Sequence, residues 1–282
     1  MHSDFIDALI EIAISEDIGD GDHTSQACIP ETAEGNARLL VKEEGILAGM
    51  DIAEKVFKKI DPDLKITSYL KDGDSILPGD VAFEISGRVV SILKSERLVL
   101  NFLQRMSGIA TRTNMFVWKL EGLRTILLDT RKTTPGLRMI EKMAVKIGGG
   151  SNHRMGLHDM ILIKDNHIDF AGGIGKAIEH VRNYLLQTNR KLKLEVEARS
   201  LDDVGEILQA GHVDRIMLDN FSPEKTIEAV KMINGRYETE SSGNITLENI
   251  REYAECGVDY ISAGALTHQI ASLDMSLKAV DF

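Results

Sequence analysis

The most basic stretch of the sequence contains residue types that bind anions. "DTRKTTPGLR", residues 129–138, places Arg131, Lys132 and Arg138 close together in a chain whose formal net charge is -11. An arginine guanidinium can bind a carboxylate or phosphate through two parallel hydrogen bonds, and a lysine supplies a compact charge. A basic cluster in an acidic protein indicates a pocket for a small anion, whereas the overall charge argues against a nucleic-acid surface.

Two carboxylates and two groups of small residues follow along the chain. Glu197 and Asp219 each stand at the end of an expected strand. They could act as acid and base, hold a Mg²⁺ ion that is bound to a phosphate, or stabilise a developing cation; they could also only neutralise the cations in salt bridges. The small residues, in "ESSGNITLENI" (240–250) and "SAGALTH" (262–268), could bind phosphate through backbone amides, or could simply form turns.

These residues are positioned by a regular alternation of short apolar runs and amphipathic segments, which predicts an α/β fold. We expect strands at 125–130, 159–164, 192–197, 214–219, 235–240 and 259–264, and helices at 136–147, 173–186, 201–211, 223–233 and 247–257, the last capped by Thr246. Pro135 is expected to open the first of these helices. The spacing is typical of parallel strands with right-handed crossovers. Chemically capable residues end nearly every strand, which favours a barrel over an open doubly wound sheet, and six strands indicate an incomplete one.

The residues before this region predict a smaller unit. Residues 4–17 read as an amphipathic helix, and the Gly- and Asp-rich "DIGDGDHTS" (17–25) as a loop. Strands around a helix at 50–60 follow, and then about thirty residues with helical periodicity, which could break at Gly108. We therefore expect a first domain at 1–110 and a second at 111–282, with the last residues able to pack back on the first.

Composition predicts a soluble protein of the cytoplasm. The 43% hydrophobic content supports a sizeable core. The two cysteines, Cys28 and Cys256, are far apart, so neither a disulfide framework nor a thiolate metal site is expected. The first residues carry acids where a signal peptide carries Lys or Arg, and no apolar run has membrane-spanning length. We expect no membrane or nucleic-acid partner.

Taken together, the motifs resemble the quinolinate phosphoribosyltransferase family over nearly the whole chain. They are "SERLVLNFLQRMSGIAT", "DTRKTTPGLR", "GGGSNHR", "ILIKDNH", "EVE", "LDNF", "ESSGNI" and "GVDYISAGALTH", in the family's order. The resemblance implies an N-terminal α/β sandwich domain and an incomplete, six- or seven-stranded α/β barrel, the type II phosphoribosyltransferase fold. It implies a homodimer with shared active sites, or a higher oligomer. The implied reaction converts quinolinate and phosphoribosyl pyrophosphate, with Mg²⁺, to nicotinate mononucleotide, pyrophosphate and carbon dioxide, a step of NAD biosynthesis.

The same resemblance implies roles for individual residues. The quinolinate carboxylates would be held by Thr130, Arg131, His153, Arg154 and Lys164, with Arg97 from the neighbouring subunit. Phosphoribosyl pyrophosphate would be held by Lys132, Glu197, Asp219, Ser242, Gly243 and Gly264, with Arg138, Asn244 and His268 as further candidates. Among these, Lys132, Glu197 and Asp219 would serve catalysis. Glu197 and Asp219 would also hold Mg²⁺, indirectly through substrate or water.

Three other functions fit parts of the pattern. A paralogue associated with molybdenum transport would share the fold and use another acceptor, but Arg131, Arg154 and Lys164 together disfavour it. A Schiff-base aldolase would use Lys164 as its nucleophile. A noncatalytic sensor of phosphorylated metabolites would bind without turnover and would leave Glu197 and Asp219 unexplained.

Overall fold

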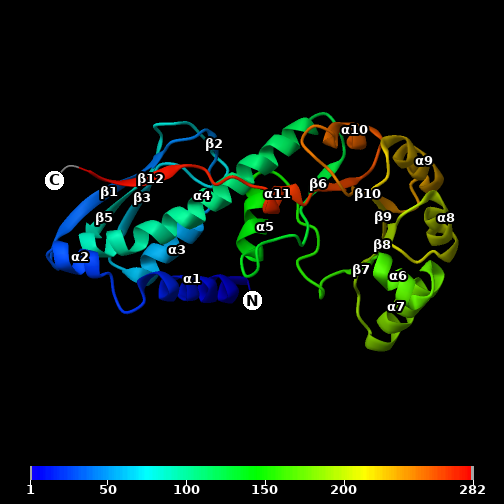
Figure 1. Cartoon of the computed structure of the whole chain (residues 1–282), viewed down its shortest axis with the longest axis horizontal. Helices are drawn as coiled ribbons and strands as arrows, with labels where there is room; N and C mark the ends of the chain where they lie inside the picture. Colours follow the sequence, from blue (N-terminus) through cyan, green and yellow to red (C-terminus); the bar gives the residue numbers. More distant parts are fainter. Residues whose placement is uncertain (1, 281–282) are drawn as a thin grey trace. The chain divides into compact units, whose positions relative to one another are not determined.

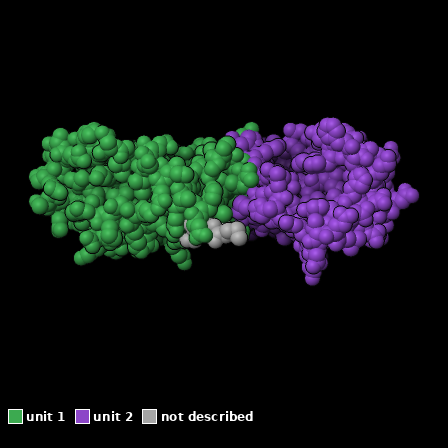
Figure 2. All heavy atoms as spheres, turned by 90° about the horizontal axis from the view of Figure 1, so that it is seen from below, with its two compact units in different colours: residues 1–114, 133–149, 269–282 green, residues 115–132, 150–268 purple. Residues whose placement is uncertain are grey.

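The computed structural model describes residues 2–280, which divide into two compact units (Figure 2). Among these residues, unit 1 contains 2–114, 133–149 and 269–280, and unit 2 contains 115–132 and 150–268. The chain therefore leaves unit 1 at Asn114, near the predicted boundary at 110, but returns to it twice. One return carries the helix after Pro135, which the sequence analysis assigned to the second domain.

Unit 1 is built on a four-stranded antiparallel sheet in the order β12-β1-β5-β3 (Figure 1). Its strands are β1 (Glu34–Val41), β3 (Lys65–Ser68), β5 (Val81–Arg88) and β12 (Met275–Val280), and β2 (Gly45–Ile46) pairs separately with β4 (Ser75–Ile76). Its helices are α1 (His2–Ile18), α2 (His23–Cys28), α3 (Met50–Ile60), most of α4 (Val89–Lys119) and α5 (Arg138–Ile147). The last strand, β12, thus completes the N-terminal sheet beside β1.

Two predictions about unit 1 are wrong in instructive ways. The expected loop at 17–25 contains the start of α2, because the Asp22 carboxylate accepts the Ser25 N–H at 3.0 Å and caps a short helix. Helix α4 continues through Gly108 without a break. A Cβ at Gly108 would lie 2.2 Å from the carbonyl oxygen of Ala271, so the glycine permits a close packing contact and does not end the helix.

Unit 2 contains a six-stranded parallel sheet in the order β6-β11-β10-β9-β8-β7, and the six strands are the six that were predicted. They are β6 (Ile126–Leu128), β7 (Ile161–Ile163), β8 (Leu194–Ala198), β9 (Arg215–Asp219), β10 (Glu238–Ser242) and β11 (Tyr260–Ser262). A parallel bridge from Leu128 to Ser151 extends the sheet beyond β6. The α/β class and the incomplete barrel are therefore confirmed.

The helices of unit 2 follow the strands, and those within residues 165–255 lie along the outside of the sheet (Figure 1). They are α6 (Asp165–Ala171), α7 (Ile174–Thr188), α8 (Leu201–Ala210), α9 (Pro223–Ile233), α10 (Ile250–Glu255) and α11 (Ala265–His268). Serine side chains cap two of them: Ser200 accepts the N–H of Asp203 before α8, and Ser222 precedes Pro223 at the start of α9. The short helices α6 and α11 were not predicted.

Two predicted helix starts are too early. Pro135 lies in a turn closed by the Leu137 N–H and the Thr134 carbonyl at 3.0 Å, and Gly136 takes the positive φ of 81° that such a Pro-Gly turn requires. Helix α5 therefore begins only at Arg138. Likewise α10 begins at Ile250, because the hydroxyl oxygen of Thr246 accepts N–H groups of a preceding turn.

The alternation of side chains along the parallel strands creates a polar face in unit 2. The strand register pairs residues of neighbouring strands whose side chains point to the same face of the sheet. It places Glu195 beside Arg215, Met217 beside Glu240, and Asp219 beside Ser242. The intervening residues, such as Val196, Ile216 and Leu218, are buried and apolar. Because side chains alternate with period two, charged groups from several strands must share one face of the sheet.

Replacing Gly108 by alanine tests the close contact in unit 1. We expect Gly108→Ala to lower the free energy of unfolding by about 1–3 kcal/mol, because the new Cβ would overlap the Ala271 carbonyl. Gly205→Ala in α8, where a Cβ meets no atom within 4 Å, is the control and should be neutral or stabilising by up to about 1 kcal/mol. Urea unfolding measures both; equal stability of the two variants would contradict the packing role.

Candidate active site

Lys164 and Glu197 lie together at the ends of neighbouring strands. The Lys164 Nζ atom donates to Glu197 Oε2 at 2.8 Å, and the Glu197 side chain is only 6% exposed whereas that of Lys164 is 46% exposed. Lys164 comes directly after β7, and β7 pairs with β8, which carries Glu197. A residue predicted for the acceptor and one predicted for the sugar therefore form one ion pair in this structure.

Two arginines, Arg131 and Arg154, also come close to each other in unit 2. Burial lowers the pKa of the Arg154 guanidinium, and the positive charge of Arg131 lowers it further. Arg154 Nη1 donates to the carbonyl of Met160 at 3.3 Å. Like charges held near one another create a positive potential that favours a bound anion.

The segment that carries Arg154 is fixed to the end of β6. Ser151 N–H donates to the Leu127 carbonyl at 2.9 Å, and the next two residues bind the buried Asp129. Asn152 Nδ2 donates to one Asp129 oxygen at 2.6 Å, and the His153 backbone N–H donates to the other at 2.9 Å. Asp129 therefore sets the backbone path that leads to Arg154.

His153 is part of a buried charge cluster on the polar face. Its Nε2 atom lies 2.9 Å from Glu195 Oε2 and 3.4 Å from Glu240 Oε2. Arg215 Nη1 donates to Glu240 at 2.8 Å, and the Arg215 guanidinium stacks 3.8 Å from the centre of the Tyr260 ring. The sequence analysis did not single out Glu240 or Arg215, although both stand at the period-two positions that could have indicated them.

The protonation of this cluster is shaped by burial and by charge. Burial lowers the pKa of His153, but the hydrogen bonds and charges of Glu195 and Glu240 outweigh it and raise the pKa to about 9. Burial, followed by the charge of Glu240, raises the pKa of Glu195 to about 7. An opposing contact comes from the Arg154 backbone N–H, which donates to His153 Nδ1 at 2.7 Å and favours an unprotonated Nδ1.

Two sets of residues have donor atoms suited to a metal. His153, Glu195 and Glu240 each offer one within 4.8 Å of the others, but these atoms already bond to one another and to Arg215, so the set fits a charge cluster better than a cation site. Glu197 and Asp219 offer carboxylate oxygens on neighbouring strands, on the same face of the sheet. Oxygen donors of this kind suit Mg²⁺, so the predicted pair fits the ion chemically.

The small-residue loop after β10 packs tightly against the end of β9. Gly243 has a φ of 90°, and a Cβ there would lie 2.2 Å from Asn220 Oδ1. Asn244 Nδ2 donates to the same Asn220 oxygen at 3.0 Å, and Asn220 Nδ2 donates to Asp219 at 2.7 Å. Ser242 is joined to β11 by a 3.1 Å hydrogen bond from the Ser262 hydroxyl. Sequence reasoning placed Asn220 at a strand end without giving it a role, and it missed Ser262.

Lys132 lies beside the next small-residue loop. Thr267 Oγ1 donates to the Lys132 carbonyl at 2.8 Å, and a Cβ at Gly264 would lie 2.9 Å from Lys132 Cδ and 3.0 Å from His268 Cε1. The His268 ring in turn contacts the Gly264 carbonyl. The structure thus brings Lys132, Gly264 and His268 together, as the shared role expected of them requires.

The remaining predicted residues have different surroundings. Thr130 Oγ1 accepts the Lys132 N–H at 3.0 Å within unit 2. Arg97 and Arg138 belong to unit 1: Arg97 is exposed on α4, and Arg138, the first residue of α5, donates from Nε to Thr133 Oγ1 at 3.0 Å. The structure therefore gathers the other predicted residues on unit 2 but does not by itself place these two with them.

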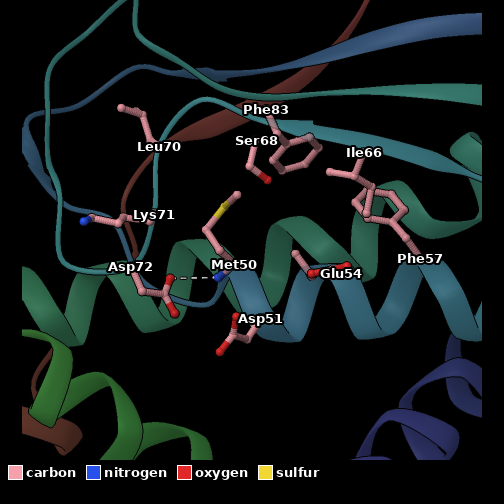
Figure 3. A pocket seen from close by; sticks show the side chains of 11 residues that line it. Met50, Asp51, Glu54, Phe57, Ile66, Ser68, Leu70, Lys71, Asp72 and Phe83 are labelled. Atoms are coloured by element: carbon pink, nitrogen blue, oxygen red, sulfur yellow. Dashed lines mark hydrogen bonds between the residues drawn. The ribbon is translucent and has the colours of Figure 1, made fainter.

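A pocket in unit 1 has a cavity volume of about 160 Å³ (Figure 3). The Asp72 carboxylate accepts the Met50 N–H there at 2.9 Å and completes the first turn of α3; burial raises its pKa despite this bond. None of the predicted site residues lines the pocket, whose other walls include Phe57 and Phe83. The Asp72 carboxylate in this pocket therefore has a structural role, which is to bind the first turn of α3.

The buried cluster predicts a stability effect. Arg215→Met should lower the free energy of unfolding by about 3–5 kcal/mol, because it leaves Glu195 and Glu240 buried without their guanidinium partner. Lys58→Met is the control, since Lys58 makes an exposed ion pair with Glu54 worth about 0.5 kcal/mol or less. Thermal and urea unfolding measure the difference; a small loss in Arg215→Met would show that the carboxylates are neutral or hydrated.

Comparison with known proteins assigns both parts of the chain. Residues 22–107 match the model of the N-terminal domain of quinolinate phosphoribosyl transferase, and residues 109–278 match that of its C-terminal domain. Quinolinate phosphoribosyltransferase [decarboxylating] 2, mitochondrial, from Nicotiana glauca is 46% identical over 96% of this chain and 81% of its own length. The probable nicotinate-nucleotide pyrophosphorylase [carboxylating] of Bacillus subtilis (strain 168) is 43% identical over 93% of this chain and 89% of its own.

Comparison with solved structures leads to the same family as comparison of the sequence. A crystal structure of NadC from Streptococcus pyogenes superimposes with a TM-score of 0.92 at 42% identity and covers 98% of this chain and 97% of its own. Matches of this extent include the strands and loops that carry the Lys164–Glu197 pair and the Gly243 turn. By sequence and by structure, the chain belongs to the quinolinate phosphoribosyltransferase family.

Proposed function

We propose that this chain catalyses the decarboxylating transfer of the phosphoribosyl group from phosphoribosyl pyrophosphate to quinolinate, yielding nicotinate mononucleotide, pyrophosphate and carbon dioxide. The main support is that cations and small-residue loops meet at the strand ends of one sheet. Arg131, Arg154 and Lys164 are suited to carboxylates, and the turns at Gly243 and Gly264 are suited to a phosphate. A substrate pair that combines an aromatic diacid and a sugar phosphate needs both.

On the acceptor side, the proposal assigns the two quinolinate carboxylates to Thr130, Arg131, His153, Arg154 and Lys164. Guanidinium groups bind planar carboxylates through paired hydrogen bonds. They therefore set the orientation of the quinolinate ring as well as neutralising its charge. This orientation matters because the ring nitrogen must approach the sugar carbon along the line of the departing pyrophosphate. An exposed cation, Arg97, would join from a second copy of the chain.

On the sugar side, the proposal assigns phosphoribosyl pyrophosphate to Lys132, Glu197, Asp219, Ser242, Gly243 and Gly264, with Arg138, Asn244 and His268 as further candidates. The backbone amides after Ser242 and near Gly264 would receive the 5′-phosphate. Glu197 and Asp219 face the sugar and would stabilise the positive charge that develops when pyrophosphate leaves. Mg²⁺, held through substrate or water by these carboxylates, would neutralise the leaving group.

Carbon dioxide leaves because the product of transfer is a pyridinium. Once the ring nitrogen is bonded to the sugar carbon as well as to its two ring neighbours, it carries a positive charge. This charge accepts the electron pair of the breaking carbon–carbon bond. The protein then needs to position the ring and exclude water, and no covalent enzyme intermediate is required. Groups that hold the ring in place, such as Arg154, therefore serve both steps.

The proposal includes a homodimer with shared sites and a place in the cytoplasm. No helix within residues 2–280 combines the length and the apolar character needed to cross a membrane. The relative from Nicotiana glauca is named mitochondrial, so location varies among similar proteins. The two distant cysteines of this chain support the cytoplasmic assignment.

Turnover of quinolinate tests the proposed reaction. The purified protein, given quinolinate, phosphoribosyl pyrophosphate and Mg²⁺, should form nicotinate mononucleotide, and nicotinate as the acceptor should give little. Arg154→Ala and Lys164→Ala should each lower kcat/KM for quinolinate by about 10- to 100-fold or more, because each removes a charged hydrogen bond. Arg182→Ala and Lys191→Ala, at exposed positions, are controls. Binding without turnover would instead favour the sensor alternative.

Subunit mixing tests the shared site. Arg97→Ala and Lys164→Ala should each be nearly inactive alone, since a site would need Lys164 from one copy and Arg97 from the other. After unfolding and refolding together in equal amounts, about a quarter of the sites should be intact, because half of the dimers are mixed and each has one unmodified site. Recovery of about a quarter of the activity supports the shared site; no recovery contradicts it.

A further inference from the structure

We propose that His153 is a positioning residue that holds the backbone of Arg154 in place and does not itself contact the acceptor. This inference rests on the proposed function and deepens it, because it changes how one of the acceptor residues acts. It separates two roles that the sequence could not distinguish. His153 would act through its protein partners, while Arg154 would touch the substrate.

Both ring nitrogens of His153 are already engaged. Nε2 lies 2.9 Å from Glu195 Oε2 and 3.4 Å from Glu240 Oε2. Burial would raise the pKa of Glu240, but its contacts with His153, Ser262 and Arg215 lower it, so this carboxylate can only accept and Nε2 must donate. Nδ1 lies 2.7 Å from the Arg154 backbone nitrogen, and that N–H can only donate, so Nδ1 must accept. A ring in this state has no N–H left for a substrate carboxylate.

The surroundings of the ring support the same tautomer. The His153 side chain is only 6% exposed, and Glu195 from β8 and Glu240 from β10 lie on its Nε2 side. Arg215 from β9 donates to Glu240, and the Arg154 backbone N–H lies on the Nδ1 side of the ring. The hydrogen bonds and charges of these two carboxylates raise the pKa of His153, but the additional proton that this shift favours would have to bind Nδ1, which faces the Arg154 N–H.

The backbone cannot easily give up the bond to Nδ1. Asp129 is fully buried and binds both Asn152 Nδ2 and the His153 backbone N–H, which fixes the peptide immediately before the ring. A proton on Nδ1 would face the Arg154 N–H across 2.7 Å, so ring protonation there would require this anchored segment to move. The hydrogen-bond geometry therefore outweighs the attraction of the carboxylates.

This arrangement controls where the Arg154 side chain begins. A small rotation of the backbone at Arg154 is amplified along its long side chain, whose guanidinium donates to the Met160 carbonyl and senses the charge of Arg131. Displacement of a binding group by about 1 Å can cost about 100-fold in rate. The cluster of His153, Glu195 and Glu240 thus acts on the acceptor through one backbone bond.

A double-mutant cycle distinguishes positioning from direct binding. We expect His153→Ala to lower kcat/KM for quinolinate by about 10-fold or more in the otherwise unchanged protein. In the Arg154→Ala background the same change should cost less than about 3-fold, because the group that His153 positions is already gone. Losses that multiply fully would show an independent contact with the acceptor and would overturn the proposal. His180→Ala, on the exposed part of α7, is the control.

Nitrogen NMR of the full chain labelled at histidine reads the tautomer directly. Comparison with His153→Ala assigns the signals. At pH 7, His153 should show a protonated Nε2 and a hydrogen-bonded, unprotonated Nδ1, and saturating quinolinate should leave both nitrogens in these states. A ring protonated on both nitrogens, free or with quinolinate bound, would overturn the proposal.

The two measurements also separate this proposal from the proposed function. If the unchanged protein does not convert quinolinate, the function fails, while the tautomer in the free protein still decides whether His153 holds Arg154. If His153→Ala does not fold, as judged by thermal unfolding, His153→Gln replaces it in the cycle. If the protein is active but the cycle is additive, only the positioning role fails.

Discussion

The period-two alternation of side chains on parallel strands is the constraint on which the site depends. It forces Glu195, Arg215 and Glu240 onto the same face of the sheet as Glu197 and Asp219. Burying carboxylates together is costly unless cations and hydrogen-bond donors satisfy them, so the Arg215 guanidinium and the Nε2–H group of His153 must accompany the glutamates. Folding of unit 2 therefore requires the buried charge cluster of His153, Glu195, Arg215 and Glu240. The groups at the strand ends lie on the same face of the sheet as this cluster.

The fold could be predicted well where local pattern and tertiary structure agree. The six strands of unit 2 are short segments between amphipathic helices, and each was found from sequence, including the polar strand β10. Helix starts at Pro135 and Thr246 were wrong because each residue also satisfies a local turn, and only packing decides between the turn and the helix. Gly108 was misread for a related reason: its neighbour Ala271 is distant in sequence.

The site could be predicted as a set of residue types but not as a set of contacts. The motif "EVE" puts Glu195 and Glu197 on one face, and the sequence favoured Glu197 only because it lies nearer the strand end. Two residues advance a strand by about 6–7 Å, which is enough to give the two carboxylates different partners. Glu197 reaches the half-exposed Lys164, whereas Glu195 meets the buried ring of His153. Glu240 was missed because its relation to His153 depends on strand order.

The balance of charge at the strand ends bears on the choice of acceptor. Arg131 and Arg154 repel each other, and Lys164 is shared with Glu197. Under the proposed function, a diacid can neutralise the arginine pair with one carboxylate and draw on Lys164 with the other. An acid with a single carboxylate leaves one of these cation groups without its anion and gains less from binding. Since Glu195 and Glu240 are already engaged by Arg215 and by the Nε2–H group of His153, they do not supply the missing negative charge, and the site discriminates by the number of carboxylates the ligand brings.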